Sequence, residues 1–166
     1  MNSHENPLTI ATKANQLVFV REVLRLRPEL ALELNQDGFR PLDVAAAYGH
    51  VEIAAEILAA GPEICLLAGR DGRTALHYAA TNGRVEIIDQ LMAASSDSAK
   101  DVTTFGETAL HLAVKSFKFE SVKSVLHWLE KVGMVEVVNW ADKEGNTALH
   151  YAASRKQLEA SFKYSC

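Results

Sequence analysis

The chain has 166 residues, of which 48% are apolar and 23% charged, and these shares are typical of a folded protein rather than a disordered one. The 17 Lys and Arg are outnumbered by 21 Asp and Glu, so the formal net charge of −4 gives no electrostatic basis for binding nucleic acid or an acidic membrane surface. No apolar stretch is long enough to span a bilayer, and Cys65 and Cys166 lie far apart, so we expect a cytoplasmic chain with free thiols and no membrane contact.

The first stretch of the chain predicts a helix pair that lacks the turn preceding the later pairs. The segment that begins at Pro7 aligns with the one at Pro41 at an offset of 34 residues. Asn15 stands where the later copies have Gly49 and Gly83, and Asn tolerates the left-handed backbone conformation better than most residues. We expect an atypical terminal repeat here, because its outer face has no neighbour.

Two regular helix pairs are predicted next. The second repeat has helices over 41–48 and 51–60, with Pro41 at a first helical position. The third has a turn at Asp71, a helix capped by Thr74, a break at Gly83 and a following helix.

The last two predicted repeats are less regular. In the fourth, Phe117 fills the slot of the helix-breaking glycine, so we expect a strained or shifted turn. Its second helix, over 119–131, is long, and five extra residues fall between Leu126 and Asn139. We interpret Trp128 and Trp140, in or beside this insertion, as gap fillers, with a binding role as the alternative. The fifth repeat is truncated, because its second helix covers only about 158–164.

A fixed period links these copies. The turn glycines Gly38, Gly72 and Gly106 are each 34 residues apart, and Gly145 follows 39 residues later. With the recurring Thr-Ala-Leu-His motif, beginning for example at Thr74, this pattern resembles the ankyrin repeat. The resemblance implies an all-α fold, an ankyrin-repeat solenoid of about five helix-turn-helix repeats with β-turn or hairpin tips and a truncated last repeat. We expect one domain over residues 1–166, with repeats at about 7–34, 35–68, 69–102, 103–141 and 142–166.

The repeated leucines and histidines are interpreted as structural. We assign one leucine per copy to the core between repeats, namely Leu42, Leu76, Leu110 and Leu149. A histidine follows three of them, at His77, His111 and His150, and each lies in its own repeat without a cluster that would complete a metal site. In the family this histidine bonds to the backbone of adjacent turns. The second repeat departs from the pattern at Asp43 and Arg40, which leaves its hydrogen bonding open. We expect no metal, no cofactor and no catalytic residues, with an enzyme as a remote alternative.

The resemblance also implies a function, because ankyrin arrays bind proteins on the concave face made by the turn tips and first helices. We therefore predict a non-catalytic protein–protein interaction module, a scaffold or signalling protein with an unknown protein partner. Carried over position by position, the candidate binding residues are Phe39, Tyr48, Arg70, Asp71, Arg73, Thr81, Asn82, Phe105, Glu107, Lys115, Lys143 and Glu144.

A closer resemblance rests on the residue sequences of the turns, such as Asn35-Gln36-Asp37-Gly38 and Asp142-Lys143-Glu144-Gly145. These turns are similar to those of plant ankyrin-repeat proteins of the defence and cell-death group, which normally carry a C-terminal membrane domain that is absent here. The resemblance implies a role in plant immunity or development. The alternative is a truncated cytosolic part of a membrane protein that acts as a regulatory or oligomerisation surface, with self-association through the uncapped C-terminal repeat.

Overall fold

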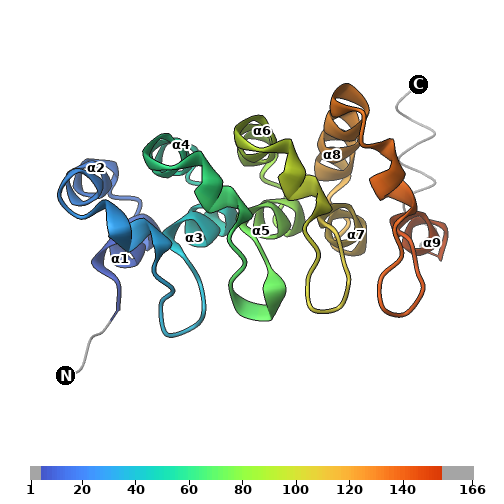
Figure 1. Ribbon diagram of the computed structural model, residues 1–166, viewed down its shortest axis with the longest axis horizontal. Helices are drawn as coiled ribbons and strands as arrows, with labels where there is room; N and C mark the ends of the chain where they lie inside the picture. Colours follow the sequence, from blue (N-terminus) through green and yellow to red (C-terminus); the bar gives the residue numbers. More distant parts are fainter. Residues whose placement is uncertain (1–4, 155–166) are drawn as a thin grey trace.

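Helix pairs follow one another along a single axis in the computed structural model, which describes residues 5–154 (Figure 1). The α-helices in this range are α1 (Pro7–Lys13), α2 (Leu17–Leu26), α3 (Pro41–Tyr48), α4 (Val51–Ala60), α5 (Ala75–Thr81), α6 (Val85–Ala94), α7 (Ala109–Lys115), α8 (Phe119–Val132) and α9 (Ala148–Ser154). The first helices of the pairs form one row, from α1 to α9, and the second helices form another, from α2 to α8. The predicted all-α ankyrin-repeat solenoid is confirmed, whereas the limits of the individual repeats stay a prediction.

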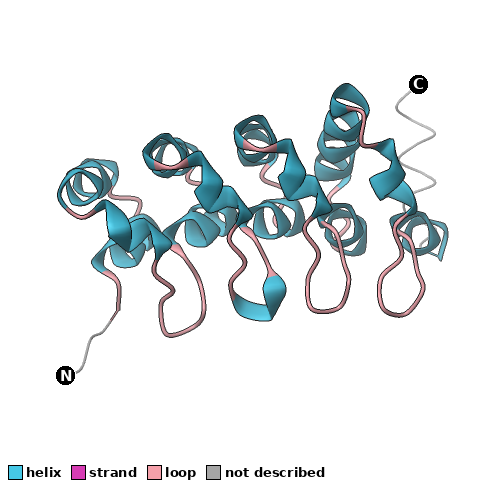
Figure 2. Cartoon of the chain, in the orientation of Figure 1, coloured by secondary structure: helices cyan, strands magenta, loops and turns pink. Residues whose placement is uncertain are grey.

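Short 3-10 segments lead from each second helix toward the loop that precedes the next pair (Figure 2). They are η1 (Pro28–Leu32), η2 (Pro62–Leu66), η4 (Ser96–Lys100) and η5 (Val135–Asn139), and η3 (Arg70–Gly72) lies within a loop. We call each of these loops a tip and number it by the helix pair that it precedes, so the second to fifth tips cover residues 35–39, 69–73, 103–107 and 142–146. A backbone hydrogen bond closes each tip; in the third tip, for example, the Gly69 N–H donates to the Arg73 carbonyl at 2.8 Å. Apart from an isolated bridge between Ala141 and Thr147, residues 5–154 contain no strand pairing.

The turns between the two helices of a pair use the left-handed conformation. Gly49 and Gly83 adopt φ values of 83° and 73°, as expected of the residue that tolerates positive φ. Asn15 and Phe117 occupy the matching places with φ values of 54° and 57°. The predicted departures at both turns are therefore confirmed, and Phe117 carries the larger strain because Asn visits this region more readily.

The core lies between the two helix rows and between successive pairs. Leu42, Leu76 and Leu110 are at most 3% exposed, as predicted for the inter-repeat leucine. The prediction for Leu149 is wrong, because its side chain is 69% exposed. Leu149 lies on α9, and no later helix of the described residues packs against it. Its burial would depend on a neighbour, as in any stacked repeat.

The fourth helix pair absorbs the insertion by lengthening its second helix. α8 has 14 residues, whereas α4 and α6 have 10 each, and Gly133 ends α8 in the left-handed conformation. Trp128 of α8 is partly buried against the core, and its Nε1–H donates to Asp89 of α6 at 2.8 Å. Trp140 is also partly buried against the core. Both indoles therefore pack against the core, as the gap-filler interpretation expects, and their role in binding stays a prediction.

The histidines join one helix pair to the next. In α5, Nδ1 of His77 accepts from the Thr74 backbone N–H at 3.0 Å, so the ring proton is on Nε2 and points to the Glu107 carbonyl 3.2 Å away. His111 repeats this arrangement with Thr108 and with the Asn146 carbonyl, at 3.2 and 3.0 Å. The predicted structural role of both histidines is confirmed. Burial lowers the pKa of His77 to about 4, which keeps the ring neutral.

The second pair makes the same junction with different groups. Asp43 is 2% exposed and its Oδ2 accepts from the Arg40 backbone N–H at 2.8 Å. The Arg40 guanidinium supplies the link to the next pair, because its Nη1 donates to the Ala68 carbonyl at 2.7 Å, while its Nε donates to the Leu32 carbonyl at 3.0 Å. Burial raises the pKa of Asp43 to about 7, against the lowering effects of the Arg40 N–H and guanidinium.

Two expectations fall wholly or partly outside the described residues. The second helix of the fifth repeat, expected at 158–164, and Cys166 lie beyond residue 154. Cys65 is a free, fully buried thiol, and burial raises its pKa to about 11. A buried thiol of such high pKa is a packing group rather than a reactive one.

Candidate interaction surface

The tips form a continuous row because each is bonded to the next through the backbone. The Arg70 N–H donates to the Gly38 carbonyl at 2.9 Å, and the Lys143 N–H donates to the Phe105 carbonyl at 3.0 Å. Glycine is needed at the contact: a Cβ on Gly72, whose φ is 69°, would lie 3.0 Å from the Thr104 backbone nitrogen. The tips therefore project side by side from one edge of the array (Figure 1).

The predicted binding residues divide by exposure. Phe105 is 59% and Tyr48 58% exposed, and Arg70, Asp71, Lys143 and Glu144 also lie exposed at the tips or helix ends. Glu107, in contrast, is 5% exposed. Two residues are engaged by their own helix: the Thr81 hydroxyl donates to the His77 carbonyl, and the Asn82 amide donates to the Tyr78 carbonyl, both at 2.8 Å.

A hollow of about 350 Å³ brings six of the twelve predicted residues together. It lies between the third, fourth and fifth tips, the end of α7 and the middle of α9. Its lining consists of Arg73, Phe105, Glu107, Lys115, Asp142, Lys143, Glu144 and Tyr151. We call it the tip hollow. The sequence reasoning missed Asp142 and Tyr151. Tyr151 occupies the same slot of its repeat as Tyr78, and this repeated tyrosine is the sequence signal that could have identified it.

Interlocking side chains hold the floor of the tip hollow in place. The Lys115 ammonium bonds to the buried Glu107 carboxylate and lies 4.9 Å from the centroid of the Tyr151 ring. The Tyr151 hydroxyl donates to Asp142 Oδ2 at 2.6 Å. The hydrogen bond to Glu107 raises the pKa of Lys115, so this ammonium stays charged. Burial raises the pKa of Asp142, but the Tyr151 hydroxyl and two backbone N–H groups outweigh it and lower the pKa, so the carboxylate stays ionised.

A second group of predicted residues adjoins the tip hollow. The ring of Phe39 meets Tyr78 of α5 edge-on, with centroids 5.5 Å apart, and Phe39 is partly buried there. The Arg73 guanidinium lies 5.9 Å from the centre of the same Tyr78 ring and also lines the tip hollow. Arg73 therefore connects the Phe39–Tyr78 pair to the tip hollow. Tyr48 stands apart, because its ring stacks on His50 at the far end of α3, with centroids 5.8 Å apart.

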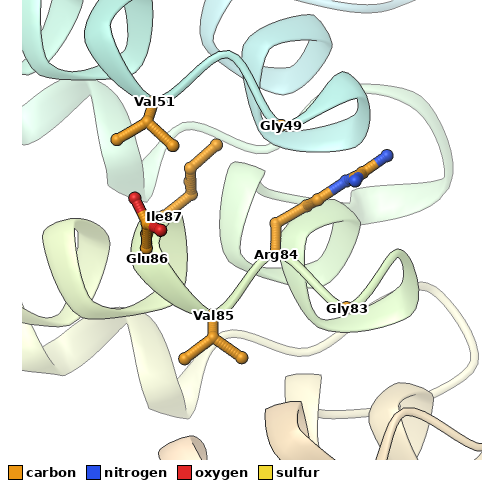
Figure 3. A pocket seen from close by; sticks show the side chains of 7 residues that line it. All are labelled: Gly49, Val51, Gly83, Arg84, Val85, Glu86 and Ile87. Carbon is orange, nitrogen blue, oxygen red and sulfur yellow. The ribbon is translucent and has the colours of Figure 1, made fainter.

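Another hollow, of about 280 Å³, lies at the opposite ends of the first helices (Figure 3). Gly49 and Val51 of the second pair face Arg84, Glu86 and Ile87 of the third pair across it. Arg84 bridges the two pairs, because its Nε donates to the Ala47 carbonyl at 3.2 Å. None of the predicted binding residues lines this hollow, which is a seam between neighbouring pairs.

Within residues 5–154, no three or more His, Cys, Asp and Glu side chains gather in a way that would hold a metal ion. Over the same range, none of the helices combines the length and the apolar character that crossing a membrane requires.

The chain belongs to the ankyrin-repeat family. A family model described as ankyrin repeats in three copies matches residues 54–133 and, overlapping with them, 97–162. Ankyrin repeats are protein–protein interaction modules, and the row of tips with its adjoining hollow is consistent with that class. No curated protein matches the chain.

Proposed function

We propose that this chain is a non-catalytic interaction module that binds its protein partner across the tips, with the tip hollow as the centre of the contact. One observation carries this proposal: the exposed Phe105 ring stands at the rim of a hollow whose floor is already fixed by the Lys115–Glu107 and Tyr151–Asp142 bonds. A large exposed ring beside preorganised polar groups is the arrangement that binding hot spots favour, because little side-chain freedom is lost on binding.

The contact needs both apolar and polar chemistry from its partner. Arg73, Lys143 and Glu144 line the tip hollow together, so its rim carries both charge signs rather than one. A partner segment with an apolar anchor against Phe105 and flanking charged groups fits this rim better than a uniformly acidic or basic one.

The test compares two triple variants in affinity capture from a plant extract, followed by titration of each captured protein. Phe105→Ala, Lys143→Ala and Arg70→Ala together remove exposed tip side chains, and we expect them to weaken binding at least tenfold. The control replaces exposed residues of the second helices, Glu52, Lys123 and Glu130, with Ala. Equal binding by both triple variants would contradict the proposal.

The finer biological role is proposed from the resemblance of the turns to plant ankyrin-repeat proteins of the defence and cell-death group. It places the array in the cytosol of a plant cell, in signalling that belongs to immunity or development. A fluorescent fusion of the wild type, expressed in leaves beside the same fusion of the Phe105, Lys143 and Arg70 triple variant (the tip variant), tests both the cytosolic location and the signalling role. We expect cytosolic fluorescence and an altered cell-death response that the tip variant lacks. A response that the tip variant reproduces would argue against a signalling role for the tips.

A further inference from the structure

The segments that connect each second helix to the next tip carry exposed apolar side chains. They cover residues 27–34, 61–68, 95–102 and 134–141 and contain η1, η2, η4 and η5. Figure 2 shows these short helices side by side between the second helices and the tips. Large apolar side chains that are 38–56% exposed recur along them, namely Leu32, Leu34, Leu66, Val102 and Val135. Leu66 and Val102 belong to inner repeats with a neighbour on each side, so an end of the array does not account for their exposure.

These segments adjoin one another, so their side chains form one surface. The Arg40 guanidinium joins the first two, because it donates to the carbonyls of both Leu32 and Ala68. A Cβ on Gly69 would lie 3.3 Å from Leu34 Cδ2, so Leu34 reaches the end of the second segment. η2 contacts η4 directly, and α8 contacts both η4 and η5. We call the exposed side of the four segments the connector face. Apolar surface that continues over neighbouring units is typical of an interaction site.

The connector face is also acidic. Five exposed carboxylates lie on its segments, namely Glu29, Glu33, Glu63, Asp97 and Glu136. The only two basic side chains of these segments are already engaged, because Arg27 pairs with Glu29, and Lys100 lies 3.5 Å from Asp97. Arg40 reaches this face from the second tip, but its guanidinium is bonded to backbone carbonyls.

Three carboxylates of the connector face therefore remain without a partner of opposite charge. Glu33, Glu63 and Glu136 form no ion pair with any basic side chain of residues 5–154. An acidic residue is common in the first turn of a helix, as at Glu63. That preference explains neither Glu33, which follows η1, nor the exposed leucines beside it.

We infer that the connector face binds a basic amphipathic segment of a protein partner. An apolar stripe of that segment covers the exposed leucines and valines, and flanking Lys or Arg side chains pair with Glu33, Glu63 and Glu136. Charge complementarity selects this occupant, because the same carboxylates repel nucleic acid and an anionic membrane surface. None of the residues that line the tip hollow belongs to these segments, so this surface is additional to the proposed function and does not depend on it.

The test titrates the full chain with synthetic helical peptides of about 18 residues, or roughly five helical turns, followed by fluorescence anisotropy. One peptide presents a Leu stripe flanked by Lys, a second has Glu in place of every Lys, and a third has Ser in place of every Leu. The Leu–Lys peptide should bind at least tenfold more tightly than either of the others. Its affinity should fall as salt is raised, because exposed charges are screened.

Two charge variants with the same change in net charge locate the binding site. Glu63→Lys with Glu136→Lys should weaken binding of the Leu–Lys peptide at least tenfold. The matched control, Glu52→Lys with Glu130→Lys, alters exposed carboxylates of the second helices and should bind as wild type does. Circular dichroism should show the helix content of wild type for both variants, since all four positions are exposed.

The apolar part of the contact is tested separately. Leu66→Ser with Val102→Ser should weaken binding of the Leu–Lys peptide, whereas Phe105→Ala should not, because Phe105 lies on a tip. The inference is overturned if wild type does not bind the Leu–Lys peptide, or if the two charge variants lose affinity equally, because binding would then follow overall charge. It is also overturned if Phe105→Ala weakens binding as much as the Leu66 and Val102 variant does. Concentration-dependent sedimentation of wild type that the Leu66 and Val102 variant abolishes would overturn it too, because a second copy would then occupy the face.

Discussion

Two neighbouring junctions of this array perform the same task with groups that respond oppositely to pH. Between the third and fourth pairs, neutral His77 receives the Thr74 N–H and donates to the Glu107 carbonyl. Between the second and third pairs the task is divided, because Asp43 receives the Arg40 N–H and the Arg40 guanidinium reaches the Ala68 carbonyl. One imidazole is thus replaced by a carboxyl group and a guanidinium.

The comparison shows that the position must cap its own helix and also hold the next tip, and that different side chains can share the two tasks. Their costs differ. The folded state favours neutral His77, whose pKa is lowered to about 4, and also favours protonated Asp43, whose pKa is raised to about 7. The contribution of His77 to the free energy of unfolding therefore falls as pH drops from about 6.5 to 4. The contribution of Asp43 falls as pH rises from about 4 to 7. In the wild type these two trends oppose each other.

The largest effect is expected from removing the histidine junction. His77→Ala should lower the free energy of unfolding by about 3–5 kcal/mol, because it leaves a cavity and unpaired buried groups at Thr74 and Glu107. Urea unfolding at pH 7 measures this change. The matched control is His150→Ala, which removes an exposed ring and should cost less than about 1 kcal/mol. Equal losses for the two variants would show that the bridge to the next pair contributes little.

The next effect isolates the carboxyl junction. Asp43→Asn keeps an oxygen that can accept from the Arg40 N–H but cannot ionise. Relative to wild type, the variant should gain stability as pH rises from 4 to 7, by at most about 1.4 kcal/mol per pH unit. Urea unfolding at several pH values gives the difference curve. A flat difference curve would show that Asp43 titrates normally in the folded chain.

The opposite trend should appear when the imidazole is replaced by a group that does not titrate. His77→Gln destabilises the junction at pH 7, and this deficit should shrink as pH falls toward 4. The reason is that wild type loses stability in that range by holding His77 neutral, whereas the variant does not. The same series of unfolding curves measures it. A deficit that grows in acid would mean that the folded chain accepts a protonated His77.

The smallest effect is expected from the guanidinium. Arg40→Met keeps the aliphatic stem but leaves the carbonyls of Leu32 and Ala68 without their donor, and it should cost about 1 kcal/mol, since both carbonyls lie near solvent. Arg25→Met is the control, because Arg25 is exposed and pairs with Glu22 on the surface, where such pairs contribute about 0–1 kcal/mol. Thermal unfolding of the two variants side by side distinguishes them.

The repeated motif predicted the helices and their turns because those depend on local chemistry, such as Thr74 before the helix and Gly83 after it. Burial of Leu149 was predicted wrongly, because burial in a stacked array depends on the next unit and not on the motif. The Arg40 bridge could not be foreseen, since it joins groups 28 residues apart through one side-chain conformation. Likewise, six residues of the tip hollow were predicted from their slots, but the Tyr151–Asp142 bond within it joins a tip to the helix that follows it through side-chain conformations that the motif does not specify.

The backbone bonds between neighbouring tips have a consequence for how such a protein diversifies. Arg70, Thr104 and Lys143 each use the main-chain N–H for this contact, and every residue except proline carries that group. Their side chains are therefore free to be exchanged while the loops keep their spacing, provided that the contacting glycines Gly38, Gly72 and Gly106 remain. A lineage can thus alter what the array recognises one loop at a time, without rebuilding the helices beneath.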